Sequence, residues 1–235
     1  MQQYLQNKKG LVEGVFDQVY DRYDLMNDFM SLGIHRLWKK SLINMMTPSV
    51  NKKLVDVACG TGDIGKLFLD KTDKKSNVTS VDPNKKMIRQ GRNKLSKYAN
   101  IEWITAPAEE LPLADNSFDY YTISFGLRNT KNLDLALSEA YRVLKPGGRI
   151  MILEFSKIPI PLMQKAYDLY SFNIIPKLGE LVVDDRDSYQ YLIESIRKFP
   201  KQDHFLKMIE HTGFEKVKYR NLSLGVAALH SGWKI

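Results

Sequence analysis

The sequence has a single cysteine, Cys59, so no internal disulfide can form. It has no apolar run long enough for a signal sequence or a transmembrane helix at either end. Its four histidines share no metal-ligand spacing with one another or with the cysteine, which argues against a metal site. Internal repeats and low-complexity tracts are also lacking. We therefore expect a cytoplasmic globular protein of one α/β domain with an elaboration.

The formal net charge of the 235-residue sequence is +8 at pH 7, so basic residues outnumber acidic ones. The lysines are scattered along the chain and few aromatic residues lie between them, which argues against a dedicated nucleic-acid groove. We expect no nucleic-acid partner. A basic balance also serves solubility or attraction to an anionic membrane surface, and composition leaves both open.

The most informative segment runs from residue 54 to residue 65 and reads LVDVACGTGDIG. It joins an apolar strand to a helix that begins at about Asp63. Gly60 and Gly62 have no Cβ, so the backbone of the turn can approach a ligand closely or adopt positive φ. The free N–H groups at the start of the helix suit an anionic group such as a carboxylate.

Two carboxylates support a ligand at this turn. Asp56 lies inside the apolar strand, and Asp82 ends the next strand, at 78–81. A carboxylate in the position of Asp82 can accept hydrogen bonds from both hydroxyls of a ribose. The glycine spacing fits the dinucleotide fingerprint, yet nicotinamide dinucleotides and S-adenosylmethionine both contain such a ribose. These residues alone do not distinguish between the two cofactors. They also allow a tight turn that binds no ligand.

Strand-like and helix-like segments alternate beyond the turn, which predicts a parallel sheet with helical crossovers. The expected strands are 101–105, 118–124 and 149–155, the expected helices are 84–95 and 133–144, and residues 145–148 form a turn. Further helices are expected at 189–198 and 202–211, the second ending at Gly213. The runs 216–222 and 226–235 predict an antiparallel hairpin at the sheet edge.

Two segments lie outside this pattern. Residues 1–50 predict a helical cover, because apolar positions recur at helical spacing over 9–23 and a second helix stops before Pro48. Residues 51–235 form the main domain, with a helical insertion at about 157–200. The aromatic-rich stripe in that insertion either packs on the core or forms a mobile wall over an apolar substrate.

Five sequence blocks, in order, resemble those of class I S-adenosylmethionine-dependent methyltransferases. The blocks are 54–65, Val81-Asp82-Pro83, 108–112 (AEELP), 115–119 (DNSFD) and 142–148 (RVLKPGG). The dinucleotide reading explains only the first block and its acidic partner, so the resemblance favours S-adenosylmethionine.

Three further blocks are similar to those of the ubiquinone/menaquinone biosynthesis C-methyltransferases. They are 23–39 (YDLMND through GIHRLWK), 122–129 (TISFGLRN) and 188–196 (SYQYLIESI). The resemblance runs from about Phe16 to the end of the sequence. It implies a Rossmann-like, mostly parallel seven-stranded sheet with helices on both faces, the C-terminal antiparallel hairpin and the N-terminal cover.

The resemblance also implies methyl transfer from S-adenosylmethionine to a ring carbon of a polyprenylated quinol. The alternative is a class I methyltransferase that acts on another small molecule or on RNA. An Asn-Pro-Pro-Tyr type block is missing after the fourth strand, which argues against RNA. The resemblance does not distinguish a benzoquinol from a naphthoquinol substrate or give the length of its tail. It also leaves the oligomeric state open, including a homodimer or a quinone-biosynthesis complex.

The family blocks assign residues to the cofactor. The expected set is Asp56, Gly60, Thr61, Gly62, Asp82, Pro107, Ala108 and Ser124. The turn would hold the methionine part, Asp56 its ammonium, and Asp82 the ribose. The position of Pro107 is commonly polar in the family, and proline has no donor. Any adenine contact there comes from the Ala108 amide or the Pro107 carbonyl.

For catalysis, Arg128 is the first candidate, because a fixed positive charge can stabilise a phenolate or position a water that removes the proton. The alternative role is a salt bridge that holds the 125–129 loop. Asp24, Asn27, His35 and Asn129 are further substrate candidates from the family blocks, although a lone histidine such as His35 is more often packed or hydrogen-bonded.

The isoprenoid tail implied by the resemblance partitions into the bilayer. We therefore expect the protein to work as a peripheral protein on the inner face of the membrane. Apolar residues 162–175 and scattered lysines are the candidates for that contact.

Overall fold

The computed structural model describes residue 31, residues 33–160, residue 169 and residues 186–235. The helix expected at 9–23, the segment 162–175 apart from Leu169, and the candidates Asp24 and Asn27 lie outside the described residues.

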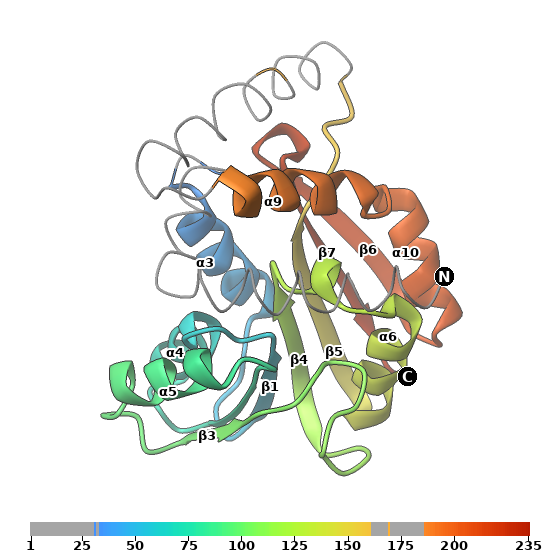
Figure 1. Ribbon diagram of the computed structural model, residues 1–235. Coiled ribbons are helices and arrows are strands. Elements are labelled where there is room, and N and C mark those ends of the chain that lie inside the picture. The colour runs from blue at the N-terminus through green and yellow to red at the C-terminus, as the bar shows by residue number, and fades with distance from the viewer. Residues whose placement is uncertain (1–30, 32, 161–168, 170–185) are drawn as a thin grey trace.

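A seven-stranded sheet with the order β3-β2-β1-β4-β5-β7-β6 forms the centre of the molecule (Figure 1). The first five strands in that order are parallel, whereas β7 is antiparallel to both β5 and β6. The strands are β1 (Lys53–Val57), β2 (Asn77–Val81), β3 (Ile101–Ile104), β4 (Phe118–Ser124), β5 (Leu144–Phe155), β6 (Glu215–Leu222) and β7 (Ala227–Trp233). This confirms the predicted mostly parallel sheet and its antiparallel C-terminal hairpin.

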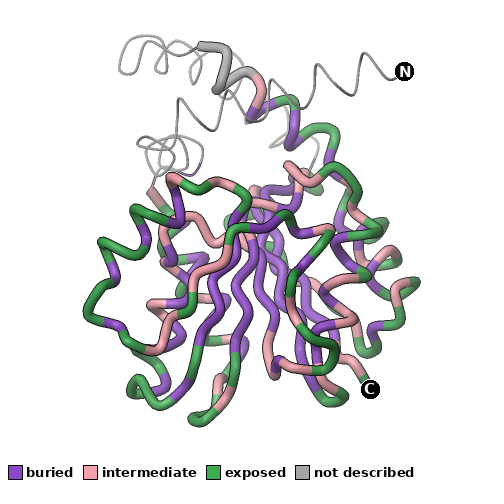
Figure 2. The backbone as a smooth tube through the Cα atoms, turned by 60° about the horizontal axis from the view of Figure 1, so that its bottom comes forward, coloured by how far each residue is buried: buried purple, intermediate pink, exposed green. Residues whose placement is uncertain are grey.

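Helices cover both faces of the sheet. They are α3 (His35–Met46), α4 (Asp63–Lys71), α5 (Lys85–Lys94), α6 (Leu133–Val143), α9 (Arg186–Lys198) and α10 (Gln202–His211), with short 3₁₀ turns η2 (Leu127–Asn129) and η3 (Ser223–Gly225). Buried side chains of α3, α4 and α9 share one core with the sheet, and those of α6 and α10 share the other. Figure 2 shows the result, a buried centre of strands enclosed by helices with exposed outer faces.

Local sequence explains where several helices begin and end. The Asn84 side chain accepts hydrogen bonds from the amides of Lys86 and Met87, at 2.8 and 3.2 Å, and so caps the start of α5. At the end of α10, Gly213 adopts φ +108°, the left-handed conformation expected of a glycine just past a helix.

One local prediction was wrong. Residues 145–148 do not form a separate turn, because β5 begins at Leu144 directly after α6. Leu144 pairs with Phe118 and Arg149 pairs with Tyr120, so the residues between them form an irregularity within the strand. Gly147, at φ +80°, allows this bulge.

Candidate active site

The two glycines of the turn after β1 have different structural roles. Both adopt positive φ, +55° at Gly60 and +86° at Gly62. A Cβ on Gly62 would lie 2.7 Å from Cη2 of Trp103 and 2.9 Å from Cδ1 of Leu95, so side-chain packing excludes one. A Cβ on Gly60 would meet nothing within 4 Å. Gly62 therefore lets the turn pack on the protein, while Gly60 leaves its backbone open to a ligand.

Asp82 lies against this turn at the end of β2. Its Oδ2 accepts a hydrogen bond from the Gly60 amide at 2.9 Å, and its Oδ1 accepts one from the Asn84 amide at 2.8 Å. Burial raises the pKa of Asp82 to about 6, although both amide hydrogen bonds act in the opposite direction. A carboxylate oxygen can accept more than one hydrogen bond, so both oxygens can still accept from ribose hydroxyls.

Asp56 lies in the centre of the sheet and is 1% exposed. The Thr122 hydroxyl donates a hydrogen bond of 2.7 Å to its Oδ1, whereas its Oδ2 is buried and has no hydrogen-bond partner among the described residues. Burial raises the pKa of Asp56 to about 7. An unsatisfied buried carboxylate oxygen is costly, so this position favours a cationic or hydrogen-bond-donating ligand.

A chain of ion pairs connects the turn to α3 and α5. Asp63, the first residue of α4, is 2.8 Å from Nζ of Lys39 and 2.8 Å from Nζ of Lys94. Lys94 also donates a hydrogen bond of 2.9 Å to the Thr61 hydroxyl. Burial opposes ionisation of Asp63, but the two lysines outweigh it and hold its pKa below the usual range. Sequence reasoning missed both lysines, because neither is adjacent to the turn in sequence.

The expected adenine contacts lie just after β3, and the expected methionine contact lies at the end of β4. Pro107 is exposed, and its carbonyl accepts a hydrogen bond of 3.4 Å from the Glu110 amide. The Ala108 amide has no hydrogen bond within the described part of the chain. The Ser124 hydroxyl, at the end of β4, is buried and has no partner among the described residues. Of the two groups expected to contact adenine, the Ala108 amide is the one left without an internal partner.

Arg128 forms a buried ion pair with Glu154 of β5. Nη1 of Arg128 lies 2.8 Å from Oε1 of Glu154, and each side chain is 2% exposed. The same Nη1 donates to the Phe125 carbonyl, and the Arg128 amide donates to Glu154 Oε2 at 3.2 Å. The salt bridge that the sequence left as an alternative role for Arg128 is thus present. Glu154 was missed, although an acidic residue inside an apolar strand is the signal that identified Asp56.

The family-specific blocks meet around η2. The Trp38 ring of α3 lies 6.2 Å from the Phe125 ring, measured between centroids, and 6.0 Å from the Phe155 ring. From α9, the Tyr191 hydroxyl donates a hydrogen bond of 3.3 Å to Oδ1 of Asn129. Segments far apart in the sequence therefore form one wall beside the carboxyl ends of β4 and β5.

His35 does not act alone at this end of the sheet. It is 1% exposed, its Nδ1 lies 3.2 Å from the Ser31 hydroxyl, and its amide donates to the same hydroxyl at 3.1 Å. These contacts match the packed, hydrogen-bonded histidine that the sequence analysis considered more frequent than a base.

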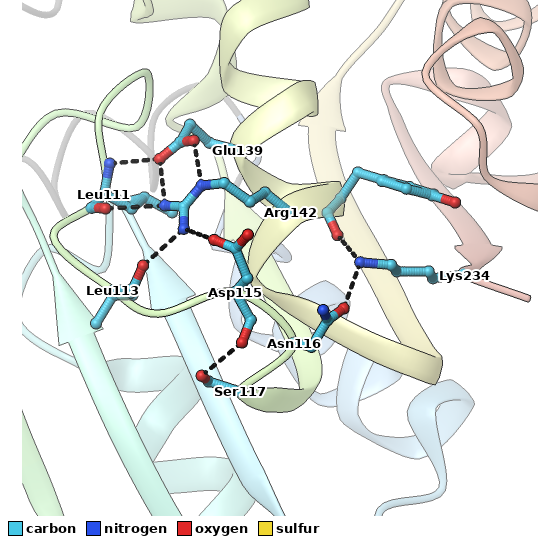
Figure 3. Close-up of polar contacts among 9 residues, drawn as sticks. Leu111, Leu113, Asp115, Asn116, Ser117, Glu139, Arg142 and Lys234 are labelled. Atoms are coloured by element: carbon cyan, nitrogen blue, oxygen red, sulfur yellow. Dashed lines mark hydrogen bonds and ion pairs between the residues drawn. The ribbon is translucent and has the colours of Figure 1, made fainter.

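Three of the general methyltransferase blocks are joined by Arg142 (Figure 3). Its guanidinium pairs with Glu139 and Asp115 and donates to the carbonyls of Leu111 and Leu113. These bonds tie the end of α6 to the loop between β3 and β4. The blocks around 111, 115 and 142 therefore stabilise the loop that follows the Pro107-Ala108 position.

Comparison with known proteins agrees with this geometry. Residues 2–234 match the ubiE/COQ5 methyltransferase family. The chain belongs to the ubiE/COQ5 methyltransferase family. It is 55% identical over 231 residues to a Roseobacter denitrificans protein named ubiquinone/menaquinone biosynthesis C-methyltransferase UbiE, covering 97% of this chain and 92% of the relative. A Brucella suis protein of the same name is 52% identical over 233 residues, covering 97% of this chain and 87% of the relative.

Solved structures show that this ubiE/COQ5 family member has a methyltransferase fold. A Thermotoga maritima S-adenosylmethionine-dependent methyltransferase, described as a possible histamine N-methyltransferase, superposes with a TM-score of 0.66 at 20% identity, covering 95% of this chain and all of that one. A Haemonchus contortus phosphoethanolamine N-methyltransferase solved with S-adenosylhomocysteine gives a TM-score of 0.63 at 14% identity, covering 84% of this chain and 52% of that one. The family and the fold together identify S-adenosylmethionine as the methyl donor.

None of the described helices of this family member has the length and apolar character needed to cross a bilayer. Among the described residues, no group of three or more His, Cys, Asp or Glu side chains is placed to hold a metal ion.

Proposed function

We propose that the chain transfers a methyl group from S-adenosylmethionine to a ring carbon of a polyprenylated quinol, as a C-methyltransferase of ubiquinone or menaquinone biosynthesis. Its full-length similarity to proteins of that name is the observation that carries this proposal. The meeting of the family-specific blocks around η2, at the carboxyl end of β4, supports it.

The proposed cofactor site follows the carboxyl ends of the parallel strands. The turn at 60–62 holds the methionine part, and Asp82 accepts hydrogen bonds from the ribose hydroxyls. The Ala108 amide donates to the adenine, since it has no hydrogen bond within the described part of the chain. Ser124 borders the methionine part from the end of β4.

The reaction requires a nucleophilic carbon. Loss of a hydroxyl proton makes the quinol ring electron-rich, and its carbon then attacks the methyl group of the sulfonium. The carbon–methyl bond forms as the sulfur–methyl bond breaks, so the sulfur leaves as the neutral thioether S-adenosylhomocysteine. The ring then loses the proton from the methylated carbon and becomes aromatic again. The protein has to align carbon, methyl and sulfur and to keep water out.

Arg128 is the proposed source of positive charge for the phenolate. It lies in η2, directly after the β4 strand end that carries Ser124. The ion pair with Glu154 and the hydrogen bond to the Phe125 carbonyl hold the guanidinium in one position. Arginine keeps its proton at all working pH values, so another group or a water must remove the hydroxyl proton.

The proposed function predicts methylation of a quinol in a defined assay. The protein would be incubated with labelled S-adenosylmethionine and short-tailed demethyl-benzoquinol or demethyl-naphthoquinol under reducing conditions. We expect label on the ring carbon of at least one quinol, and the oxidised quinones serve as controls because they lack the electron-rich ring. Transfer of label to neither quinol would overturn the proposal.

We also propose that the protein docks on an anionic membrane surface beside the site. Trp38 donates a hydrogen bond of 3.0 Å to Ser223, which joins α3 to η3. Next to these two residues, Leu37 and Leu224 are 58% and 61% exposed. Leu224 also adopts φ +60°, a conformation that costs energy for a residue with a branched side chain. Apolar side chains displayed in this way suit the acyl boundary of a bilayer.

This docking proposal predicts a loss of vesicle binding when both leucines become serine. Leu37→Ser with Leu224→Ser should lower the fraction that sediments with phosphatidylglycerol vesicles at low salt severalfold, because the buried apolar area is lost. Leu135→Ser is the matched control, since Leu135 is 53% exposed on α6. If control and double variant lost binding equally, or wild type did not bind, the docking surface would be wrong. Methylation of a short-tailed quinol should be unchanged in both.

A further inference from the structure

Asp56 and Thr122 form a buried pair in which one carboxylate oxygen, Oδ2 of Asp56, has no hydrogen-bond partner among the described residues. Thr122 is fully buried and lies directly opposite Asp56 in the register of β1 and β4. We propose that Thr122 is a positioning residue, whose hydroxyl fixes Oδ1 of Asp56 and leaves Oδ2 oriented toward the ammonium of the cofactor's methionine part. This inference rests on the proposed cofactor site.

The hydrogen bond fixes which oxygen faces a ligand. Thr122 Oγ1 donates to Oδ1 of Asp56 at 2.7 Å, a short distance typical of a hydroxyl bound to a carboxylate. The other oxygen, Oδ2, is left without a partner among the described residues. Side chains two positions apart on a strand point to the same face, so Thr122 shares its face of β4 with Ser124. The cofactor residue Ser124 and the proposed positioning residue are therefore neighbours.

The same hydrogen bond favours the charged form of Asp56. Burial acts against ionisation and is the largest influence on this carboxyl group. The Thr122 hydrogen bond opposes burial, and so does the positive charge of Lys39 on α3. Asp63 of α4 and Asp82 of β2 act with burial, as their negative charges repel a third one. Among the described residues, Thr122 is thus the hydrogen-bond donor that offsets the burial of Asp56.

Two other polar groups near Asp56 do not replace Thr122. Cys59 is itself kept protonated, because burial and the charges of Asp82 and Asp56 raise its pKa. Ser80 lies opposite Asp56 on β2, but its hydroxyl forms no hydrogen bond that would satisfy Oδ2. The hydrogen bonding of the Asp56 carboxylate consequently depends on Thr122 and on the ligand, while Lys39 contributes charge alone.

These contacts make the affinity for the cofactor depend on pH. With a pKa of about 7, Asp56 is about half ionised at neutral pH before the cofactor binds. An ammonium binds the ionised form, so affinity should rise as the pH rises through that value. Without the Thr122 hydroxyl the pKa rises further. The ionised fraction of Asp56 at pH 7 is therefore smaller when this hydroxyl is missing.

The test uses Thr122→Val, which keeps the side-chain shape and removes the hydroxyl, and Thr122→Ser, which keeps the hydroxyl. Binding of S-adenosylhomocysteine would be measured by calorimetry between about pH 6 and about pH 8. We expect Thr122→Val to bind severalfold more weakly at pH 7, with its affinity rising at higher pH than in wild type. Thr122→Ser should behave like wild type.

The control ligand is 5′-methylthioadenosine, which has the adenosine part without the ammonium. Its affinity should be equal in wild type and Thr122→Val, which also shows that the variant folds. An unchanged pH profile for S-adenosylhomocysteine in Thr122→Val would overturn the inference, and so would equal weakening of both ligands. If wild type bound S-adenosylhomocysteine at no pH, the proposed cofactor site itself would fail.

Discussion

Replacing Arg128 with alanine is expected to lower turnover by about 10²–10³-fold, the effect of removing one group that stabilises developing negative charge. The affinity for the cofactor should remain near that of wild type, because none of the proposed cofactor residues lies in the 125–129 loop. Steady-state turnover with a short-tailed quinol and calorimetry with S-adenosylhomocysteine measure the two quantities separately.

The buried ion pair adds a second effect that has to be separated from catalysis. Arg128→Ala leaves Glu154 buried without its cation, and breaking such a pair costs about 3–5 kcal/mol of the free energy of unfolding. A double variant, Arg128→Met with Glu154→Leu, removes both charges and fills the space with apolar side chains. We expect it to recover much of the lost stability.

Turnover in the double variant decides the role of Arg128. If the guanidinium acts on the substrate, the double variant stays inactive although it is stable. If the ion pair only holds the 125–129 loop, turnover returns together with stability, and the catalytic role is wrong. Arg128→Lys provides a further comparison, because it keeps the charge and loses the fixed geometry of the guanidinium.

Replacing Asp82 with alanine is expected to weaken S-adenosylmethionine binding by about a hundredfold or more. Hydrogen bonds to a charged acceptor contribute about 1.5–3 kcal/mol each, and the ribose would lose both of its own. The variant also frees the amides of Gly60 and Asn84, so the turn should be less ordered. Calorimetry with S-adenosylhomocysteine measures the loss.

The control for this prediction is Asp70→Ala, which removes an exposed carboxylate on α4 that pairs with Lys66. It should leave the cofactor affinity unchanged. Wild type should also lose affinity as the pH falls below about 6, because a protonated Asp82 carboxyl is a poorer acceptor for the ribose hydroxyls. An Asp82→Ala variant that bound S-adenosylhomocysteine like wild type would remove Asp82 from the site.

The strands and most helices could be predicted from the sequence because their signals are local. Apolar runs mark β1, β2 and β4, and Asn84 and Gly213 mark helix ends. The bulge at 145–148 could not be predicted, because a Pro-Gly-Gly run has the same letters in a turn and in a strand irregularity. A turn and a strand irregularity differ here in whether the flanking residues pair with β4, and that pairing depends on residues far away in the sequence.

In the candidate site, too, some residues could be predicted from local sequence and others could not. Asp56 and Asp82 could be identified because each lies at a position where the neighbouring residues are apolar. The interaction partners in the site come from distant parts of the chain. Thr122 of β4 bonds to Asp56, and Glu154 of β5 pairs with Arg128. Lys39 of α3 pairs with Asp63, and only the folded chain brings such partners together. Arg128 could be selected from sequence, but its pairing could be offered only as one of two roles.

The order of strands at the sheet edge has a consequence for folding during synthesis. β7 lies between β5 and β6, although β6 precedes it in the chain. On the ribosome, β6 emerges first and has no neighbour to pair with, while the edge of β5 stays open. Both strands can join the sheet only after β7 has been translated, so nascent chains shorter than this point should be the ones that need a chaperone.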